Sequence, residues 1–456
     1  MSAISYRPAQ SAGPTRPSRR PAGCLAAAGA PALALAAGMA AFGIAANRPA
    51  QAADGDFQGA SHILAFDEDT LGYSKSDATG PIARLQRQIE AGELKLEFDP
   101  AFGYLPAVLR ALNVSRASQM LVFSKTSFQR ERISPHTPRS LFFNDDVYVG
   151  YIPGSPLLEL SMADPQLGGV FYTLEQKAAP RPLLVRTDQC LECHASAKSM
   201  GVPGHLVRSF VTDDDGVVDL NTGVSLVTHR TPFSDRWGGW YVTGTHGKQV
   251  HRGNLFGKAA FARQESDPNF AGNLADLGRL VDSDKYLGKG SDIVALMVLE
   301  HQAHMHNFLT RLRYEATLSL RQYGHVNYLK TVLNAFLRYL LFVDEAPLAS
   351  PIQGNPAFVE WFASQGPADA AGRSFRQFDL KTRLFKYPCS YLIHSEAFDQ
   401  LPAPVKTRVY ERLWEIVSGQ DTSPEFEKLT PESRTAIREI LMQTKKDLPA
   451  CWRPAG

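Results

Sequence analysis

The sequence predicts an α+β protein in which a mixed, β-containing domain over residues 121–272 precedes a mainly α-helical region over residues 273–456. Two patterns lead to this prediction. Between about 120 and 255, short β-branched and aromatic runs alternate with Asn-Asp, Pro-Gly and Gly-Gly pairs, which is typical of strands joined by turns. Beyond residue 273, long stretches without Gly or Pro carry apolar residues at the spacing of amphipathic helices.

The first 52 residues have the features of a cleaved export signal. Residues 1–22 carry arginines and no acid, and an apolar run rich in Ala, Gly and Leu follows over 24–46. Ala50 and Ala52 then occupy the small-residue positions of an Ala-x-Ala cleavage site. A retained membrane anchor is the alternative, since the run is nearly long enough to span a bilayer. We expect cleavage and a mature protein in the periplasm, or otherwise exported.

The charge of the mature chain is close to neutral. Residues 1–52 contain five of the 48 basic side chains and none of the 46 acidic ones, which leaves 43 against 46. A balance near −3 gives no indication of nucleic acid or of an anionic membrane as a partner. No membrane span is expected after the signal is cleaved, and the oligomeric state stays open.

A helical N-terminal segment is predicted over residues 53–120. Ile82, Leu85 and Ile89 repeat at the three-to-four spacing of an amphipathic helix, and residues 105–114 form a second, shorter helical pattern.

The β-containing region is predicted to begin with a meander. Residues 140–176 read as successive strands separated by turn pairs, and strand-like runs resume over 205–233 and 237–247. Asp215-Gly216 predicts a hairpin turn. The aspartates that precede this glycine lack the alternating spacing of a calcium-binding loop.

Helices are predicted through the C-terminal region. Residues 290–324 form one long helical pattern, with Ser291 as the candidate N-cap. Further helical patterns cover residues 325–342, 404–419 and 431–448.

The stretch CLECH, in which Cys190, Cys193 and His194 stand together, carries the strongest chemical pattern. In covalent haem attachment, two thiols add to the two vinyl groups and the adjacent histidine becomes an axial iron ligand. A structural zinc site needs four ligands, and the chain has no second CxxC. A thiol redox pair needs no histidine, and Glu192 opposes a lowered thiol pKa. A random CxxCH is expected only about once or twice per thousand chains of this length, so the motif and the export signal together favour haem.

In these residues the chain resembles c-type cytochromes. The resemblance covers the five-residue motif and the export signal, and it implies one covalent haem c on Cys190 and Cys193 with His194 as the proximal iron ligand. It does not extend to the class I cytochrome c fold, because strands flank the motif and no methionine lies between Met200 and Met297. A looser resemblance links the strand-rich flanks to PAS-like or Cache-like sensor domains that carry a c-type haem.

The second axial ligand of the iron has two candidates, His246 and His301. Gly244 and Gly247 would let the backbone at His246 approach a flat ligand closely. His301 lies in a helical pattern, on one face with His304. The alternatives are surface or packed histidines, and a separate metal bound by His301 and His304 alongside Glu300.

Two arginines near the motif, Arg186 and Arg208, are candidates for the haem propionates through bidentate hydrogen bonds, and solvated arginines are the alternative. His205 is expected near a propionate or a turn rather than on the iron. Farther along, Cys389 and Cys451 form either a disulfide or two separate thiols.

Three functions follow from the sequence. The first is an exported monohaem c-type cytochrome that transfers electrons with a redox partner protein. The second is a haem-dependent oxidoreductase such as a peroxidase or oxidase, with no catalytic residues assigned. The third is a haem-based redox or gas sensor. The occupant of the second axial position separates them.

Overall fold

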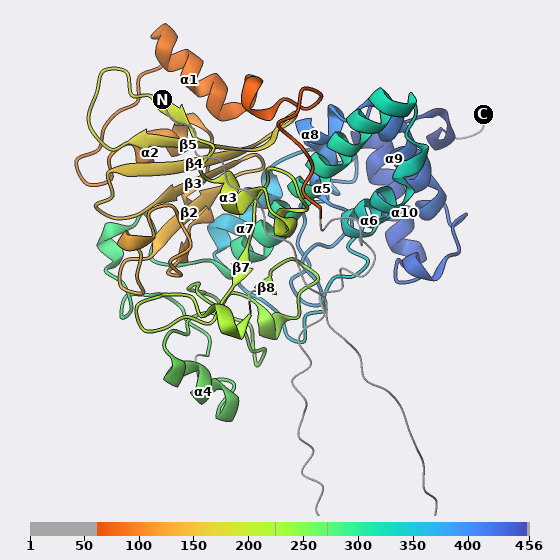
Figure 1. Cartoon of the computed structure of the whole chain (residues 1–456). Coiled ribbons are helices and arrows are strands. Elements are labelled where there is room, and N and C mark those ends of the chain that lie inside the picture. The colour runs from red at the N-terminus through yellow and green to blue at the C-terminus, as the bar shows by residue number, and fades with distance from the viewer. Residues whose placement is uncertain (1–61, 224, 271, 454–456) are drawn as a thin grey trace, which may run out of the picture. The chain divides into compact units, whose positions relative to one another are not determined.

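A six-stranded antiparallel sheet organises the first half of the chain in a computed structural model that describes residues 62–453, except 224 and 271 (Figure 1). Each strand pairs with the next along the chain, so the sheet is a meander: β1 (Met120–Val122), β2 (Arg139–Phe143), β3 (Val147–Tyr151), β4 (Leu157–Asp164), β5 (Gly168–Glu175) and β6 (Leu184–Arg186). The predicted meander and α+β class are confirmed. The predicted export signal, residues 1–52, lies outside the described residues.

One detail of the predicted meander is wrong. The pair Gly168 and Gly169 begins β5, and the turn before it is formed by residues 165–167. Gly168 has a φ of 76° and an added Cβ would lie 2.4 Å from Thr310, so glycine is needed here for conformation and for close packing.

One face of the sheet packs against the two predicted N-terminal helices, α1 (Pro81–Ala91) and α2 (Leu105–Ala111). Ile82, Leu85 and Ile89 are all buried there, as their spacing predicts. They contact alternate strand residues, because successive strand side chains point to opposite faces.

The opposite face of the sheet is buried at one end and open at the other. Tyr148, Ser161 and Phe171 are direct neighbours across β3, β4 and β5, and the segment that follows the sheet covers them. The next row of side chains on this face, two residues away along each strand, contains Glu159 of β4 and Val185 of β6. The exposed fraction of Val185 is 48%. An exposed apolar side chain thus lies on β6, the strand that leads into CLECH.

Residues 187–292 are mostly irregular. They contain α3 (Leu191–His194), α4 (Lys258–Ser266) and a small sheet of β7 (Arg208–Ser209) and β8 (Ser225–Leu226). Of the strand-like runs predicted here, the one over 205–233 forms only the short strands β7 and β8, and the one over 237–247 forms isolated bridges and no strand. Much of this backbone bonds to distant segments instead, as when Tyr241 donates to the Leu121 carbonyl. The turn at Asp215-Gly216 is confirmed, with φ 83° at the glycine.

The longest helix, α5 (Ile293–Tyr323), is buried on every side from its start to Leu312. Asp292 caps it by accepting a hydrogen bond from the Ala295 amide at 2.8 Å. The predicted cap, Ser291, instead accepts from the Leu121 amide and donates to the Tyr241 carbonyl, so its hydroxyl ties α5 to the sheet.

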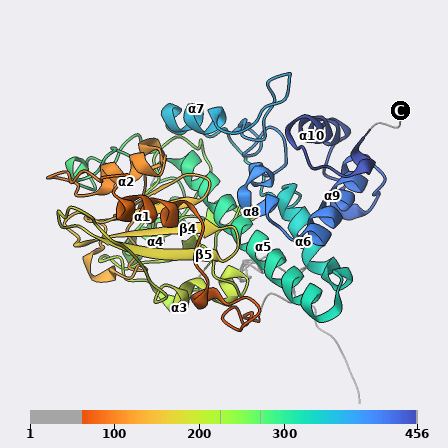
Figure 2. The ribbon, with the colours of Figure 1, turned by 90° about the horizontal axis from the view of Figure 1, so that it is seen from above.

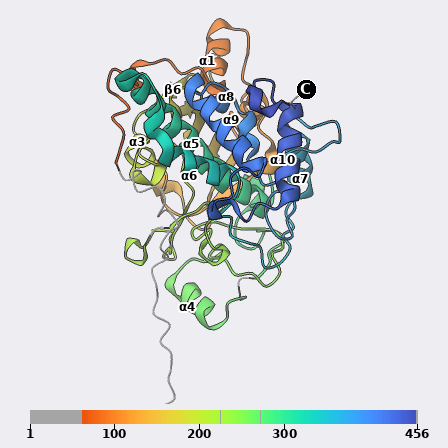
Figure 3. The ribbon, with the colours of Figure 1, turned by 90° about the vertical axis from the view of Figure 1, so that its right-hand side faces the viewer.

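Five shorter helices complete the described chain: α6 (Lys330–Leu340), α7 (Pro356–Ser364), α8 (Glu396–Asp399), α9 (Ala403–Val417) and α10 (Pro431–Thr444). Figure 2 shows α5 between the sheet and the pair α9 and α10, and Figure 3 shows α6, α9 and α10 from the right-hand side of Figure 1. The patterns at 325–342, 404–419 and 431–448 are confirmed as α6, α9 and α10. The sequence pattern does not predict α4 or α7.

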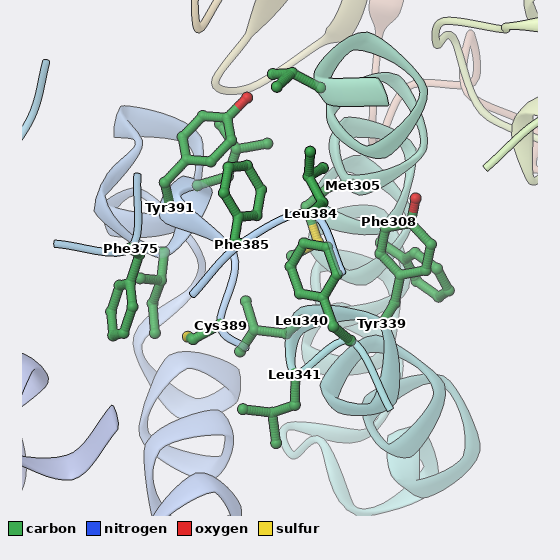
Figure 4. Packing of buried hydrophobic residues seen from close by; sticks show 14 of the residues in the cluster. Met305, Phe308, Tyr339, Leu340, Leu341, Phe375, Leu384, Phe385, Cys389 and Tyr391 are labelled. Carbon is green, nitrogen blue, oxygen red and sulfur yellow. The ribbon is translucent and has the colours of Figure 1, made fainter. Parts of the chain in front are cut away.

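The core of this region is largely aromatic and aliphatic. Figure 4 shows side chains of α5, α6 and the segment 375–391 that point toward one another, including Phe308, Tyr339 and Phe385. Cys389 belongs to this core, whereas Cys451 is exposed, and both are free thiols. The disulfide alternative is therefore not present. None of the described helices has the length and apolarity that a membrane span requires.

A buried ion pair joins α5 to the irregular region. The Arg236 guanidinium donates to Glu300, and the Trp237 indole donates to the other oxygen of the same carboxylate at 3.0 Å. Arg236 also donates to the carbonyls of Thr231 and His229, at 2.8 and 3.2 Å. Both charged side chains are almost completely excluded from water.

Candidate haem-attachment site

CLECH forms a single helical turn at the end of the sheet. Cys190 is the N-cap of α3, and its carbonyl accepts from the amides of Cys193 at 3.2 Å and His194 at 2.9 Å. Residues three apart on a helix are neighbours on its surface. The two thiols therefore share one side of the turn. Both are free, with Cys193 exposed and Cys190 partly buried, so both can react with a group that lies against the protein surface.

The imidazole of His194 has the arrangement of a metal ligand. Its Nδ1 lies 2.9 Å from the Gly204 carbonyl oxygen, which fixes Nδ1 as the protonated nitrogen and leaves Nε2 free to bind a metal. Burial lowers the pKa of His194 to about 4, against the raising effect of the Gly204 hydrogen bond. At neutral pH the ring is therefore uncharged, as metal binding requires.

The loop after His194 is closed on itself. The Gly204 amide donates back to the His194 carbonyl at 2.8 Å, so residues 194 and 204 exchange two hydrogen bonds. The Ser199 hydroxyl contacts the His194 and Val202 carbonyls at 3.1 and 2.9 Å. The Gly169 amide, on β5, donates to the Pro203 carbonyl at 2.8 Å. The iron-ligand candidate is thus held from both ends of its loop.

Two aromatic rings contact His194 among the described residues. Phe171 lies 4.8 Å from it, centroid to centroid, and His205 lies 6.5 Å away. His205 is itself buried. It packs on Tyr148 at 4.3 Å, and its Nε2 lies 3.1 Å from the Ser161 hydroxyl. His194 therefore stands on the boundary between the buried and the open end of the sheet face.

Charged groups surround the motif on its open side. The guanidinium groups of Arg208 and Arg139 both lower the pKa of His194, after burial, and the carboxylate of Glu159 raises it. Burial and Glu159 raise the pKa of the Cys190 thiol to about 11. A thiol that resists ionisation is a poor redox nucleophile, which argues against the thiol-pair interpretation.

The two arginines predicted near the motif make different contacts. Arg186 donates to the Tyr73 and Ser76 carbonyls at 2.7 and 2.8 Å, and it lies over the Tyr73 ring at 4.7 Å. It fastens the segment before α1. Arg208 stacks on the Phe210 ring at 5.1 Å and lies close enough to Cys193 for their charges to interact.

A third arginine was not predicted. Arg139 donates to Glu159 at 2.6 Å, and its Nε is buried with no hydrogen-bond partner among the described residues. It reaches the motif because the register of β2, β3 and β4 places it there, and no local sequence pattern indicates this.

The structure places the two candidates for the second axial ligand in other clusters. The two ring nitrogens of His301 are 2.8 Å from His229 Nδ1 and 2.8 Å from the Ser390 hydroxyl. His246 packs against His251, 4.6 Å between centroids, with its Nε2 3.2 Å from the Gly272 carbonyl. Neither ring contacts His194.

The second metal considered for His301 and His304 finds no support. His304 packs against Phe308 and Tyr339, 5.1 and 4.9 Å between centroids. Within residues 62–453, apart from 224 and 271, no group of three or more His, Cys, Asp or Glu side chains is arranged to hold a metal ion.

Comparison with known proteins adds no assignment. No family model, no curated protein and no solved structure matches the chain. The resemblances to c-type cytochromes and to PAS-like or Cache-like domains stay predictions from the sequence.

Proposed function

We propose that this chain is an exported monohaem c-type cytochrome that transfers electrons through one haem c. The observation that carries the proposal is the state of His194. This histidine directly follows two accessible thiols on one helical turn, and it is uncharged, with Nδ1 bonded to a carbonyl and Nε2 free. A thiol redox pair requires no histidine, and a structural zinc site requires four ligands, of which this motif supplies three.

The residues present fit the group. Cys190 and Cys193 would form the thioether bonds, and His194 would bind the iron. Arg208 and Arg139 supply positive charge beside the motif for the propionates, and the buried, unpartnered Nε of Arg139 is a donor without an acceptor. The exposed Val185 offers apolar surface on the same side of the sheet.

When bound, haem supplies a one-electron redox couple whose potential depends on its axial ligands, their hydrogen bonds and its burial. The chain's own residues keep the His194 imidazole neutral and fixed in one tautomer. Phe171 and the closed loop 194–204 keep water from one side of that ring. A redox partner protein would donate or accept the electron.

Replacing both motif cysteines tests the attachment. We expect the exported wild-type protein to retain haem after denaturing electrophoresis and to gain the mass of one haem. Cys190→Ala combined with Cys193→Ala should abolish both signals, because no thioether can form. Cys451→Ala is the matched control, since it removes an exposed thiol outside the motif and should change neither. A wild-type protein exported by a strain competent in haem attachment, yet free of haem, would refute the proposal.

A haem-dependent oxidoreductase is the second candidate, and one observation favours it. Both ring nitrogens of His301 have partners, His229 and Ser390, and Nε2 of His246 lies 3.2 Å from the Gly272 carbonyl, so the second axial position has no assigned ligand. An open position on the iron permits peroxide or gas chemistry. A six-coordinate, low-spin spectrum in both oxidation states would support electron transfer. A high-spin ferrous form that binds carbon monoxide, with peroxide turnover above free haem, would establish the second candidate instead. The sensor hypothesis gains no specific observation.

A further inference from the structure

Asn307, on the fully buried part of α5, makes two hydrogen bonds to one residue of the loop behind His194. Its Oδ1 accepts from the His205 amide at 2.8 Å, and its Nδ2 donates to the His205 carbonyl at 2.8 Å. The backbone partners fix the orientation of the side-chain amide, because an N–H must donate and a carbonyl must accept.

The side chain of Asn307 packs directly against the backbone of the loop, with no side chain between them. A Cβ added to Gly204 would lie 2.1 Å from Asn307 Oδ1. On the other side, a Cβ added to Gly169 of β5 would lie 2.9 Å from the Gly204 amide nitrogen. The peptide at Gly204 is therefore enclosed between the sheet and α5 with no space for a side chain.

One peptide unit links Asn307 to His194. The Gly204 carbonyl and the His205 amide belong to the same planar peptide group. The His194 Nδ1–H bonds to the oxygen of this group at 2.9 Å, and Asn307 accepts from its N–H at 2.8 Å. Hydrogen bonds in such a chain polarise one another, and they do so more strongly in a buried, low-dielectric position.

We propose that Asn307 is a positioning residue that sets the reduction potential of the haem through the Gly204–His205 peptide and His194. By accepting from the peptide N–H, Asn307 increases the negative charge on the Gly204 oxygen and strengthens its bond to His194 Nδ1–H. A stronger bond makes the imidazole a more electron-donating ligand, which stabilises ferric iron and lowers the potential. This inference rests on the proposed function.

Asn307→Leu should therefore raise the reduction potential. The variant removes the acceptor and keeps the branching and the number of heavy atoms of the side chain, and we expect the redox equilibrium to shift about tenfold toward ferrous haem, about 59 mV for one electron. The frequency of the iron–histidine stretch should fall. Gln302→Leu is the matched control, because Gln302 is an equally buried amide on α5 that bonds to Tyr148 and Asn144 rather than to the loop. It should leave the potential near the wild-type value.

A second variant separates positioning from folding. Asn307→Asp keeps the oxygen that accepts from the His205 amide, and its protonated carboxyl can donate to the His205 carbonyl in place of Nδ2, so its potential should lie at or below that of the wild type. If both Asn307 variants raise the potential, or if Gln302→Leu shifts it as much as Asn307→Leu does, Asn307 acts only through the fold and the proposal is wrong. If Asn307→Leu does not fold, the sign of the change in reduction potential in Asn307→Asp still decides whether the proposal is right.

A readout without haem keeps this inference separate from the proposed function. In the full chain with Cys190→Ala and Cys193→Ala, the NMR shift of the His194 Nδ1–H proton reports the strength of its hydrogen bond. Asn307→Leu should move this resonance upfield, and Gln302→Leu should not. An unmoved resonance would overturn the coupling even if haem attaches as proposed. A moved resonance would support the coupling even if the wild type carries no haem.

Discussion

Lowering the pH from 7 to about 5 is expected to unfold the protein. Burial lowers the pKa of eight histidines, to about 4 at His194 and about 3 at His251, for example. The other members of the set are His205, His229, His301, His304, His306 and His394. At pH values between the pKa of a buried histidine in the folded protein and its ordinary pKa near 6.5, that histidine binds a proton in the unfolded chain and not in the folded one. Stability is therefore lost as the pH falls through this window.

Four buried carboxyl groups act in the opposite direction. Burial raises the pKa of Asp146 to about 7, of Asp292 to about 6 and of Glu300 to about 8, and it also raises the pKa of Glu345, so these groups release protons on unfolding. Eight histidines against four carboxyl groups leave a net uptake of about four protons. Each net proton changes the free energy of unfolding by about 1.4 kcal/mol per pH unit, so about 6 kcal/mol is lost per unit. A total stability of roughly 5–15 kcal/mol is removed within about two units.

Circular dichroism and tryptophan fluorescence during an acid titration will check this expectation, with potentiometry for the protons taken up. The transition should centre near pH 5 and involve several protons. His325→Asn provides a control, because His325 lies outside the buried set and its loss should not move the midpoint. A protein that stays folded to pH 4 would contradict the expectation.

Arg236→Leu is expected to destabilise the fold by about 3–5 kcal/mol, because it leaves the Glu300 carboxylate buried without its cation. The pKa of Glu300 is already raised to about 8, and without Arg236 it rises further. Below about pH 8 the folded wild type and the folded variant both bind this proton, so the deficit of the variant grows only as the pH rises above about 8. Urea denaturation at one pH below 8 and one pH above it measures both effects.

The double variant Arg236→Leu with Glu300→Leu separates charge from packing. Replacement of a whole buried ion pair by apolar residues is often neutral, so most of the lost stability should return. If the double variant is as unstable as the single one, the loss arises instead from the hydrogen bonds of the pair to other groups: the Thr231 and His229 carbonyls, which accept from Arg236, and the Trp237 indole, which donates to Glu300.

Sequence periodicity predicts those elements whose partners lie nearby along the chain. The meander and helices α1, α5, α6, α9 and α10 follow from local spacing, since strands joined by short turns pair with their neighbours. The segment 237–247 was misassigned because its backbone bonds to residues about one hundred positions away, such as Leu121 and Gln353. Its β-branched and aromatic residues fill a core without forming a ladder.

The same distinction applies to the candidate site. CLECH is local, so its cysteines and histidine are visible in the sequence. Arg139 and Asn307 come to the site through sheet register and through the packing of α5, over separations of 55 and 113 residues from His194. Gly204 has no local signature beyond its small size. The contacts that orient the ligand could therefore not be predicted from the sequence.

The burial of α5 from Ile293 to Leu312 has a consequence for hydrogen exchange. The helix contacts the sheet on one side and α6 on the other, and its side chains from Ile293 to Leu312 are enclosed. Its amides can meet solvent only when both sets of neighbours have separated, so the helix cannot open as a local unit. Deuterium uptake along α5 should therefore be slowest and proceed by global unfolding. A probe on the sheet and a probe on α9 should then report a single transition.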